Sequence, residues 1–161
     1  MQNVKYFVIH WREEEIKVEH DNEETIIYER KINYYETDKM GVVHHSNYIR
    51  FLEEARCYWM EKIGIPFSAL EAKGVTIPVL GVNVEYKHHV TFGDTILIKV
   101  IIKEYSGVRM TVSYDVRDKK TGEKVIEAET KHCFTNKELR PVNLKKYAPE
   151  FEEKFKEYLE K

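Results

Sequence analysis

Cysteine is scarce in this sequence, and the positions of the two cysteines exclude two kinds of site. Cys57 and Cys133 lie far apart, and neither belongs to a Cys-x-x-Cys or Cys/His spacing. Disulfide-stapled domains carry dense, even sets of cysteines, and zinc sites repeat them at short intervals. We therefore expect neither a disulfide framework nor a cysteine-ligated metal, but two packed or half-exposed thiols in a reducing compartment.

Long apolar runs and an excess of one charge are also absent. No stretch approaches the roughly 18 apolar residues that a membrane helix needs, and no basic leader precedes an apolar segment at the start. The 26 basic and 28 acidic side chains nearly balance, so net charge favours neither nucleic acid nor anionic lipid. We expect a cytoplasmic protein with no nucleic-acid partner and no membrane span.

Internal repeats, low-complexity tracts and linker-like segments are missing too. A chain of 161 residues with 42% apolar side chains is long enough for one domain with a real core. We expect three parts. Residues 1–25 form an N-terminal extension of extra strands or a mobile tail, residues 26–144 form the main domain, and residues 145–161 form a C-terminal surface helix.

A long helix is predicted over residues 47–63. Apolar residues recur there every three or four positions, with glutamates on the other side. The stripe consists of Tyr48, Phe51, Leu52, Ala55, Tyr58, Trp59 and Met60. Gly64 can end the helix and Pro66 discourages its continuation. So wide an apolar face needs cover around most of its circumference, which a curling sheet would supply.

The hydrophobic period changes to two after Pro78. Four alternating stretches follow, at residues 82–86, 96–102, 110–116 and 126–134, and the turns between the last three are short enough for hairpins. Residues 25–33 supply a fifth strand before the helix. The predicted fold class is α+β, with one antiparallel sheet packed on one long helix.

Reactive side chains crowd the segment before this helix, YETDKMGVVHHSN. The first turn of a helix has unpartnered N–H groups and partial positive charge, which can polarise a carbonyl oxygen. Ser46 or Asn47 suits the N-cap, and Gly41 lets the chain turn so that Asp38 can face the same point. A carboxylate beside an N–H cluster pairs a nucleophile or general base with an electrophile activator, as acyl transfer requires.

The segment YYETDKMGVVHHSNYIRFLEEAR resembles the signature Y-x-D-T-D-x-x-G-V-V-Y-H-x-N-Y of hotdog-fold acyl-CoA thioesterases, in the 4-hydroxybenzoyl-CoA thioesterase-like branch that includes Tol-Pal-associated enzymes. The likeness continues through VEYKHHVTFGDTI to RPVNL, over residues 27–144. It implies a curved antiparallel sheet wrapped around a central helix, in dimers or tetramers with active sites between protomers. It also implies hydrolysis of an acyl-CoA to a free carboxylic acid and CoA, with no cofactor beyond the substrate's CoA.

The resemblance assigns roles residue by residue. Asp38 falls on the catalytic aspartate and His45 on the histidine of the signature, while Gly41, His45 and Asn47 would position the oxyanion. The backbone N–H at or next to His45 would polarise the thioester carbonyl. Simpler roles remain open on the residues alone, because Asp38 could be a turn carboxylate and His45 could only hydrogen-bond at the helix start.

The acyl pocket is expected to draw partly on a neighbouring protomer. Its predicted residues are Val42, Val43, Tyr48, Ile77 and Val79. A basic rim should receive the CoA phosphates, although such side chains on a strand are usually only solubilising. Its candidates are Lys87, His89, Arg109 and Arg140. His44 stands where the family usually has tyrosine and His89 where proline is common, so pocket and CoA contacts should differ there.

Two other functions stay open on the same fold, because fold does not determine function. One is a non-catalytic acyl-thioester-binding protein, and the other is a hotdog dehydratase or hydratase; the spacing TDKMGVVHH favours hydrolysis. The pairs His44–His45 and His88–His89 with Asp38 raise the idea of a zinc site. Adjacent histidines on a strand point in opposite directions, so we expect no metal.

Overall fold

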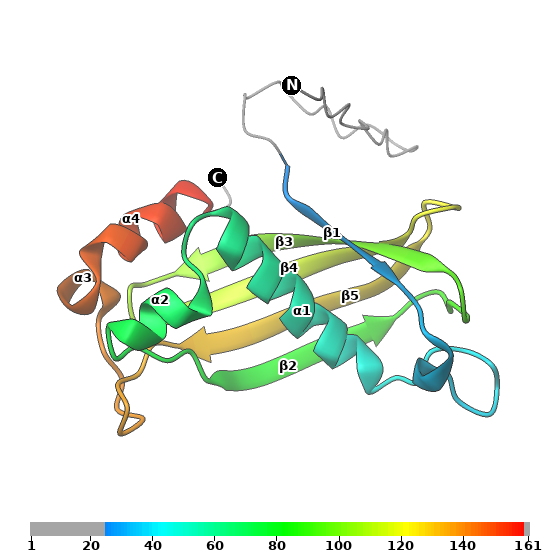
Figure 1. The fold of residues 1–161 in the computed structure, drawn as a ribbon, viewed down its shortest axis with the longest axis horizontal. Coiled ribbons are helices and arrows are strands. Elements are labelled where there is room, and N and C mark those ends of the chain that lie inside the picture. The colour runs from blue at the N-terminus through cyan, green and yellow to red at the C-terminus, as the bar shows by residue number, and fades with distance from the viewer. Residues whose placement is uncertain (1–24, 160–161) are drawn as a thin grey trace.

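The computed structural model describes residues 25–159, in which a five-stranded antiparallel sheet packs on one long helix (Figure 1). The strands are β1 (Ile27–Lys31), β2 (Val79–Tyr86), β3 (Thr95–Tyr105), β4 (Arg109–Asp118) and β5 (Lys124–Cys133). Their order in the sheet is β1-β3-β4-β5-β2, so β1 and β2 form the two edges. The predicted N-terminal extension lies outside the described residues except for Thr25.

The hairpins follow from the alternating pattern and from glycine at the turns. Gly107 joins β3 to β4 and Gly122 joins β4 to β5, both with positive φ, a region that glycine enters without a Cβ clash. The resulting register places Val100 opposite Tyr114, and Tyr114 opposite Ala128. These three side chains are buried on the same sheet face, and that face carries the core.

The helix α1 (Asn47–Lys62) crosses that face of the sheet (Figure 1). Tyr58 of the predicted stripe is half-buried, and the other six residues are buried: Tyr48, Phe51, Leu52, Ala55, Trp59 and Met60. Burying each large side chain contributes about 1.5–3 kcal/mol, so this stripe fixes the helix on the sheet. One charged residue, Arg56, is buried with them. The predicted α+β layout, with a sheet around a central helix, is confirmed.

Three shorter helices complete the fold: α2 (Phe67–Ala72), α3 (Leu144–Tyr147) and α4 (Pro149–Glu157). The sequence did not predict α2, because Pro66 was interpreted only as a stop signal. Pro66 is instead the N-cap of α2, where the missing N–H of proline costs nothing.

The predicted C-terminal helix corresponds to α4, which closes one end of the core (Figure 1). Phe155 is fully buried and stacks on Trp59 and Tyr105, with ring centroids 6.4 and 5.8 Å away. The helix thus lies at the surface but contributes its apolar stripe to the same core as α1. Across residues 25–159, none of the helices is both long and apolar enough to span a bilayer.

Candidate active site

The segment between the 3-10 turn Tyr34–Glu36 and α1, residues 37–46, is called the entrance loop below. It folds back on itself as a small hairpin, in which the Asp38 N–H donates to the Val42 carbonyl at 2.9 Å. The Gly41 N–H donates to the Asp38 carbonyl, also at 2.9 Å, and Gly41 has a φ of 79°. A residue with a Cβ would be strained there, which explains the glycine. The loop leads directly into the first turn of α1 (Figure 1).

The Asp38 carboxylate is half-exposed at the start of this hairpin. Its Oδ1 accepts the Met40 N–H at 2.7 Å, which is the contact of a turn carboxylate. Its Oδ2 contacts no hydrogen-bond donor among residues 25–159. The turn contact therefore orients the carboxylate and leaves one oxygen available for water or a substrate.

At the start of α1 the Ser46 N–H donates to His44 Nδ1 at 3.3 Å, and the preceding N–H, that of His45, is left without an acceptor in the described part of the chain. Ser46 occupies the N-cap position, but its hydroxyl makes no cap hydrogen bond and lies 2.8 Å from His44 Nδ1 instead. The positive end of the helix dipole and a free N–H thus coincide, which suits a carbonyl oxygen or an oxyanion.

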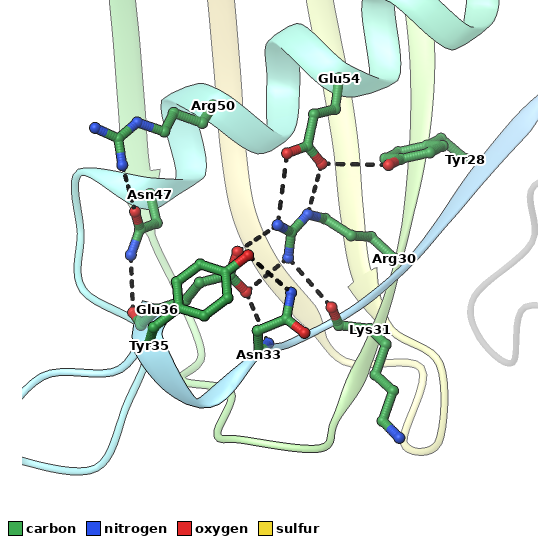
Figure 2. A network of polar contacts seen from close by, with 9 residues as sticks. All are labelled: Tyr28, Arg30, Lys31, Asn33, Tyr35, Glu36, Asn47, Arg50 and Glu54. Atoms are coloured by element: carbon green, nitrogen blue, oxygen red, sulfur yellow. Dashed lines mark hydrogen bonds and ion pairs between the residues drawn. The ribbon is translucent and has the colours of Figure 1, made fainter.

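Asn47 joins the two ends of the entrance loop rather than capping the helix (Figure 2). Its Nδ2 donates to the Glu36 carbonyl at 2.8 Å, and its Oδ1 accepts from Arg50 Nη1 at 3.2 Å. The first helical residue is therefore held against the residue that precedes the loop.

The entrance loop also contacts the end of β2 and the segment that follows it. The Val43 N–H donates to the Val90 carbonyl at 2.9 Å, and Val43 is buried. The Tyr86 hydroxyl donates to the His45 carbonyl at 3.0 Å, and the Tyr86 ring packs edge-on against Tyr48. Burial, with the Tyr86 phenol beside it, raises the pKa of Tyr48 to about 12, so Tyr48 stays neutral.

The five predicted pocket residues do not gather within one protomer. Val42, Val43 and Tyr48 lie at the entrance loop, near the Tyr86 end of β2. Val79 lies seven residues away at the other end of this strand, which corresponds to roughly 23 Å, and Ile77 precedes it. Within one chain these residues form two separate groups, so the prediction of a pocket that draws partly on a neighbouring protomer stays a prediction.

The predicted basic rim is likewise divided. Lys87 follows β2 close to the loop, but it is paired with Glu85 at 2.7 Å and Glu127 at 3.6 Å. The hydrogen bond with Glu85 is the largest of the effects that raise its pKa. His89 is exposed and stacks on His88. Lys87 therefore offers a charge that glutamates already compensate.

Arg109 and Arg140 lie at the opposite end of the sheet from Lys87. Arg109 opens β4 opposite Cys133, at the end of β5 that also faces Val79. Arg140 belongs to the turn after β5, where its N–H donates to Asn136 Oδ1 at 2.9 Å. The four residues therefore form no single patch in one protomer, and their role in CoA binding stays a prediction.

The paired histidines differ from the expectation in geometry. The His88 and His89 rings stack with centroids 4.9 Å apart, and those of His44 and His45 are 4.1 Å apart. Strand alternation does not apply to His88 and His89 because β2 ends at Tyr86. In the part of the chain that the structure describes, no group of three or more His, Cys, Asp or Glu residues could hold a metal ion.

Sequence reasoning missed three residues that hold the site. Tyr86 supports the helix start, and Arg30 with Glu36 forms a buried ion pair beside the loop (Figure 2). One signal was present, since Glu36 follows Asn33 by three residues, the spacing at which a glutamate returns to an N-cap N–H. The Asn33 N–H indeed donates to Glu36 Oε2 at 2.7 Å.

A hollow of about 400 Å³ lies elsewhere, on the sheet face turned away from α1. Its lining includes Asn83, Ser113, Asp115 and Glu129. These residues alternate with the core-facing ones along β2, β4 and β5, so the hollow and Asp38 are on different sides of the sheet. It carries none of the predicted site residues.

A curved antiparallel sheet packed on one central helix (Figure 1) is the architecture of the hotdog fold. The chain belongs to the Thioesterase-like superfamily, whose sequence model matches residues 32–159. It is 32% identical over 124 residues to a Bacillus subtilis (strain 168) protein named "Putative acyl-CoA thioesterase YneP", covering 76% of this chain and 89% of the relative. The predicted family resemblance is confirmed.

Solved structures of thioesterases have the same fold as this chain. The DHNA-CoA thioesterase from Staphylococcus aureus superimposes with a TM-score of 0.78 at 30% identity, over 81% of this chain and 88% of that one. The 4-hydroxybenzoyl-CoA thioesterase from Pseudomonas sp. strain CBS-3 superimposes with a TM-score of 0.71 at 21% identity, over 81% and 98%. The predicted hotdog fold is confirmed.

Proposed function

We propose that this protein is an acyl-CoA thioesterase that hydrolyses an acyl thioester to a free carboxylic acid and CoA. The observation that carries the proposal is that two groups of the entrance loop have no hydrogen-bond partner among residues 25–159, namely the His45 N–H near the start of α1 and Asp38 Oδ2. Family membership and the names of the relatives support the same reaction class.

In the proposed mechanism the substrate carbonyl oxygen accepts the His45 N–H at the positive end of α1. Negative charge that develops on this oxygen is stabilised by the donor and the helix dipole. Asp38 either attacks the carbonyl carbon, releasing CoA thiolate and leaving an anhydride for water to cleave, or takes a proton from an attacking water. In both routes thioester and water become acid and thiol, and both need an ionised Asp38. The His45 ring is exposed and has the smaller part.

We further propose that the working unit contains two or more copies. The edge strand β2 exposes apolar side chains: Val79 (48%), Leu80 (55%), Val82 (42%) and Tyr86 (51%). An apolar edge with unpaired backbone groups favours strand pairing with a second copy. A two-fold axis makes such a pairing antiparallel, so Val79 of the second copy approaches Tyr86 of the first. Ile77 and Val79 could then complete a pocket with Val42, Val43 and Tyr48.

The test is thiol release from a panel of acyl-CoAs by wild type and Asp38→Asn. We expect kcat to fall at least about a hundredfold, as it does when a positioned acid/base group is lost. Asparagine keeps an oxygen for the Met40 N–H, so the hairpin should persist. Asp118→Asn is the control for a turn carboxylate elsewhere, because the buried Asp118 Oδ1 accepts the Lys120 N–H at the same 2.7 Å and the Thr121 N–H at 2.8 Å. The control should keep wild-type kcat.

The outcomes separate the alternatives. Equal rates from wild type and Asp38→Asn would remove the assigned role of Asp38. Tight acyl-CoA binding without thiol release from any substrate would identify a binding protein. Addition of water to an enoyl-CoA, again without thiol release, would identify a hydratase.

A further inference from the structure

A guanidinium held between two carboxylates lies beside the entrance loop (Figure 2). Arg30 on β1 binds Glu36 through both terminal nitrogens, with Nη1 to Oε2 at 2.8 Å and Nη2 to Oε1. Its Nε donates to Glu54 Oε2 on α1 at 2.6 Å. A two-pronged contact fixes the orientation of both partners as well as their distance.

The contact between Arg30 and Glu36 is largely shielded from water, whereas the Glu54 side chain is 42% exposed. Only 10% of the Arg30 side chain and 5% of the Glu36 side chain are exposed. The guanidinium carbon lies 3.7 Å from the centre of the Phe51 ring, which covers one face. Burial alone would raise the pKa of Glu36, but the Arg30 and Asn33 hydrogen bonds lower it overall, so the carboxylate stays charged.

Glu36 also connects the two ends of the entrance loop through its backbone. Its carbonyl accepts the His44 N–H at 2.9 Å and Asn47 Nδ2 at 2.8 Å. Asp38 follows Glu36 by two residues. Whatever fixes Glu36 relative to α1 therefore also fixes Asp38 relative to the helix start.

The second carboxylate supplies the fixed point on the helix. Glu54 lies seven residues after Asn47, about 10 Å further along α1. The chain of contacts Glu54–Arg30–Glu36 thus ties the loop to the body of the helix and to β1. The tip of the loop has little apolar burial to hold it, because Lys39, Met40 and Gly41 are exposed.

We propose that Arg30 and Glu36 are positioning residues that hold the entrance loop, and with it Asp38, at the start of α1. Neither residue has a place in the chemical steps of the proposed mechanism. The catalytic consequence rests on the proposed thioesterase function, but the order imposed on the loop does not. The experiment below therefore measures loop order and catalysis separately.

The first measurement is amide hydrogen exchange over residues 37–47 in wild type, Glu36→Gln and Glu54→Gln. Glutamine in place of Glu36 turns an NH₂ group toward Arg30 or the Asn33 N–H, which breaks one side of the contact. We expect the Asp38 and His44 amides to exchange roughly tenfold faster in Glu36→Gln, the factor for losing one charged hydrogen bond. Glu54→Gln weakens the anchor on α1, but the Glu54 side chain is 42% exposed and glutamine keeps an oxygen for Arg30 Nε, so exchange should rise by no more than about twofold.

The second measurement is the split between kcat and KM. Glu36→Gln should lower kcat by about tenfold with KM nearly unchanged, because the misplaced group is Asp38 rather than a binding surface. Arg30→Lys keeps the positive charge but loses the two-nitrogen contact with Glu36. It should show the same lower kcat with nearly unchanged KM, and it replaces Glu36→Gln if that variant folds poorly. Equal exchange rates and equal kcat in the Glu36 and Glu54 variants would overturn the proposal. If amide exchange is faster in Glu36→Gln but the wild-type protein releases no thiol, the positioning role of Arg30 and Glu36 stands and only the thioesterase function is refuted.

Discussion

The Tyr86 hydroxyl donates a 3.0 Å hydrogen bond to the His45 carbonyl, 41 residues earlier in the chain. This bond joins the last residue of edge strand β2 to the peptide that precedes α1. Because β2 is also the strand proposed to pair with a second copy, one phenol connects the helix start to the expected subunit contact.

Replacing Tyr86 with phenylalanine tests the weight of this bond. The ring that packs on Tyr48 is kept and only the hydroxyl is lost. One neutral hydrogen bond contributes about 1 kcal/mol to stability, so we expect the melting temperature to fall by at most a few degrees and kcat to fall by up to about fivefold. Tyr147→Phe, in α3, is the control. A kcat equal to that of the control would show that the His45 peptide needs no support from β2.

A second relationship, in the core, makes stability depend on pH. Arg56 Nη1 donates to the Tyr114 hydroxyl at 3.4 Å, Tyr114 contacts Thr130 Oγ1 at 2.9 Å, and Thr130 contacts His132 Nε2 at 2.7 Å. Arginine can only donate, so the Tyr114 oxygen accepts from Arg56, and an unprotonated His132 Nε2 is able to accept from the Thr130 hydroxyl. Burial first, and the Arg56 charge second, lower the pKa of His132 to about 4.

The direction of the pH effect follows from this lowered pKa. The unfolded chain binds a proton at His132 near pH 6.5, whereas the folded protein does not until about pH 4. The free energy of unfolding should therefore fall as pH drops from about 6.5 toward 4, by on the order of 3 kcal/mol. Urea unfolding at a series of pH values measures it. His132→Gln should flatten the curve, and the exposed His89→Gln should not. A wild-type stability that is constant from pH 7 to 5 would contradict the prediction.

Periodicity was enough to predict the main elements of the fold. The apolar stripe at every third or fourth position gave α1 to within one residue of its observed end, and period-two alternation gave all of the four later strands. Both signals work because one face of each element is buried. The entrance loop was also locatable, since a glycine, a carboxylate and a helix start are adjacent in the sequence.

The missed features depend on contacts between distant segments. Ile77 and Val79 were assigned to the same pocket as Val42, but the sequence did not show that the direction of β2 places them at the far end of the strand within one chain. The bond between Arg30 and Glu36 requires β1 to end beside a 3-10 turn, which no local pattern specifies. Pro66 has two opposite meanings, helix stop and helix start, and only the packing of α2 decides between them.

The last prediction tests whether edge strand β2 of one copy completes the acyl pocket beside Asp38 of a second copy. Val79→Asp would place a charge in an acyl pocket, and Asp38→Asn would disable the loop, so each variant alone should be nearly inactive. If Val79 of one copy serves Asp38 of the other, a mixed dimer regains one intact site of its two. Random exchange of subunits from an equal mixture gives half mixed dimers, and thus about a quarter of wild-type activity.

The control distinguishes this shared site from a site within one chain. Val42 lies in the entrance loop with Asp38, so a mixture of Val42→Asp and Asp38→Asn disables the loop of every copy. That mixture should stay inactive after the same exchange of subunits. Native mass spectrometry checks that mixed oligomers have formed in both cases. If mixed oligomers of Val79→Asp and Asp38→Asn form but recover no activity, then the far end of β2 has no part in the neighbouring site, and the pocket must be completed by other residues.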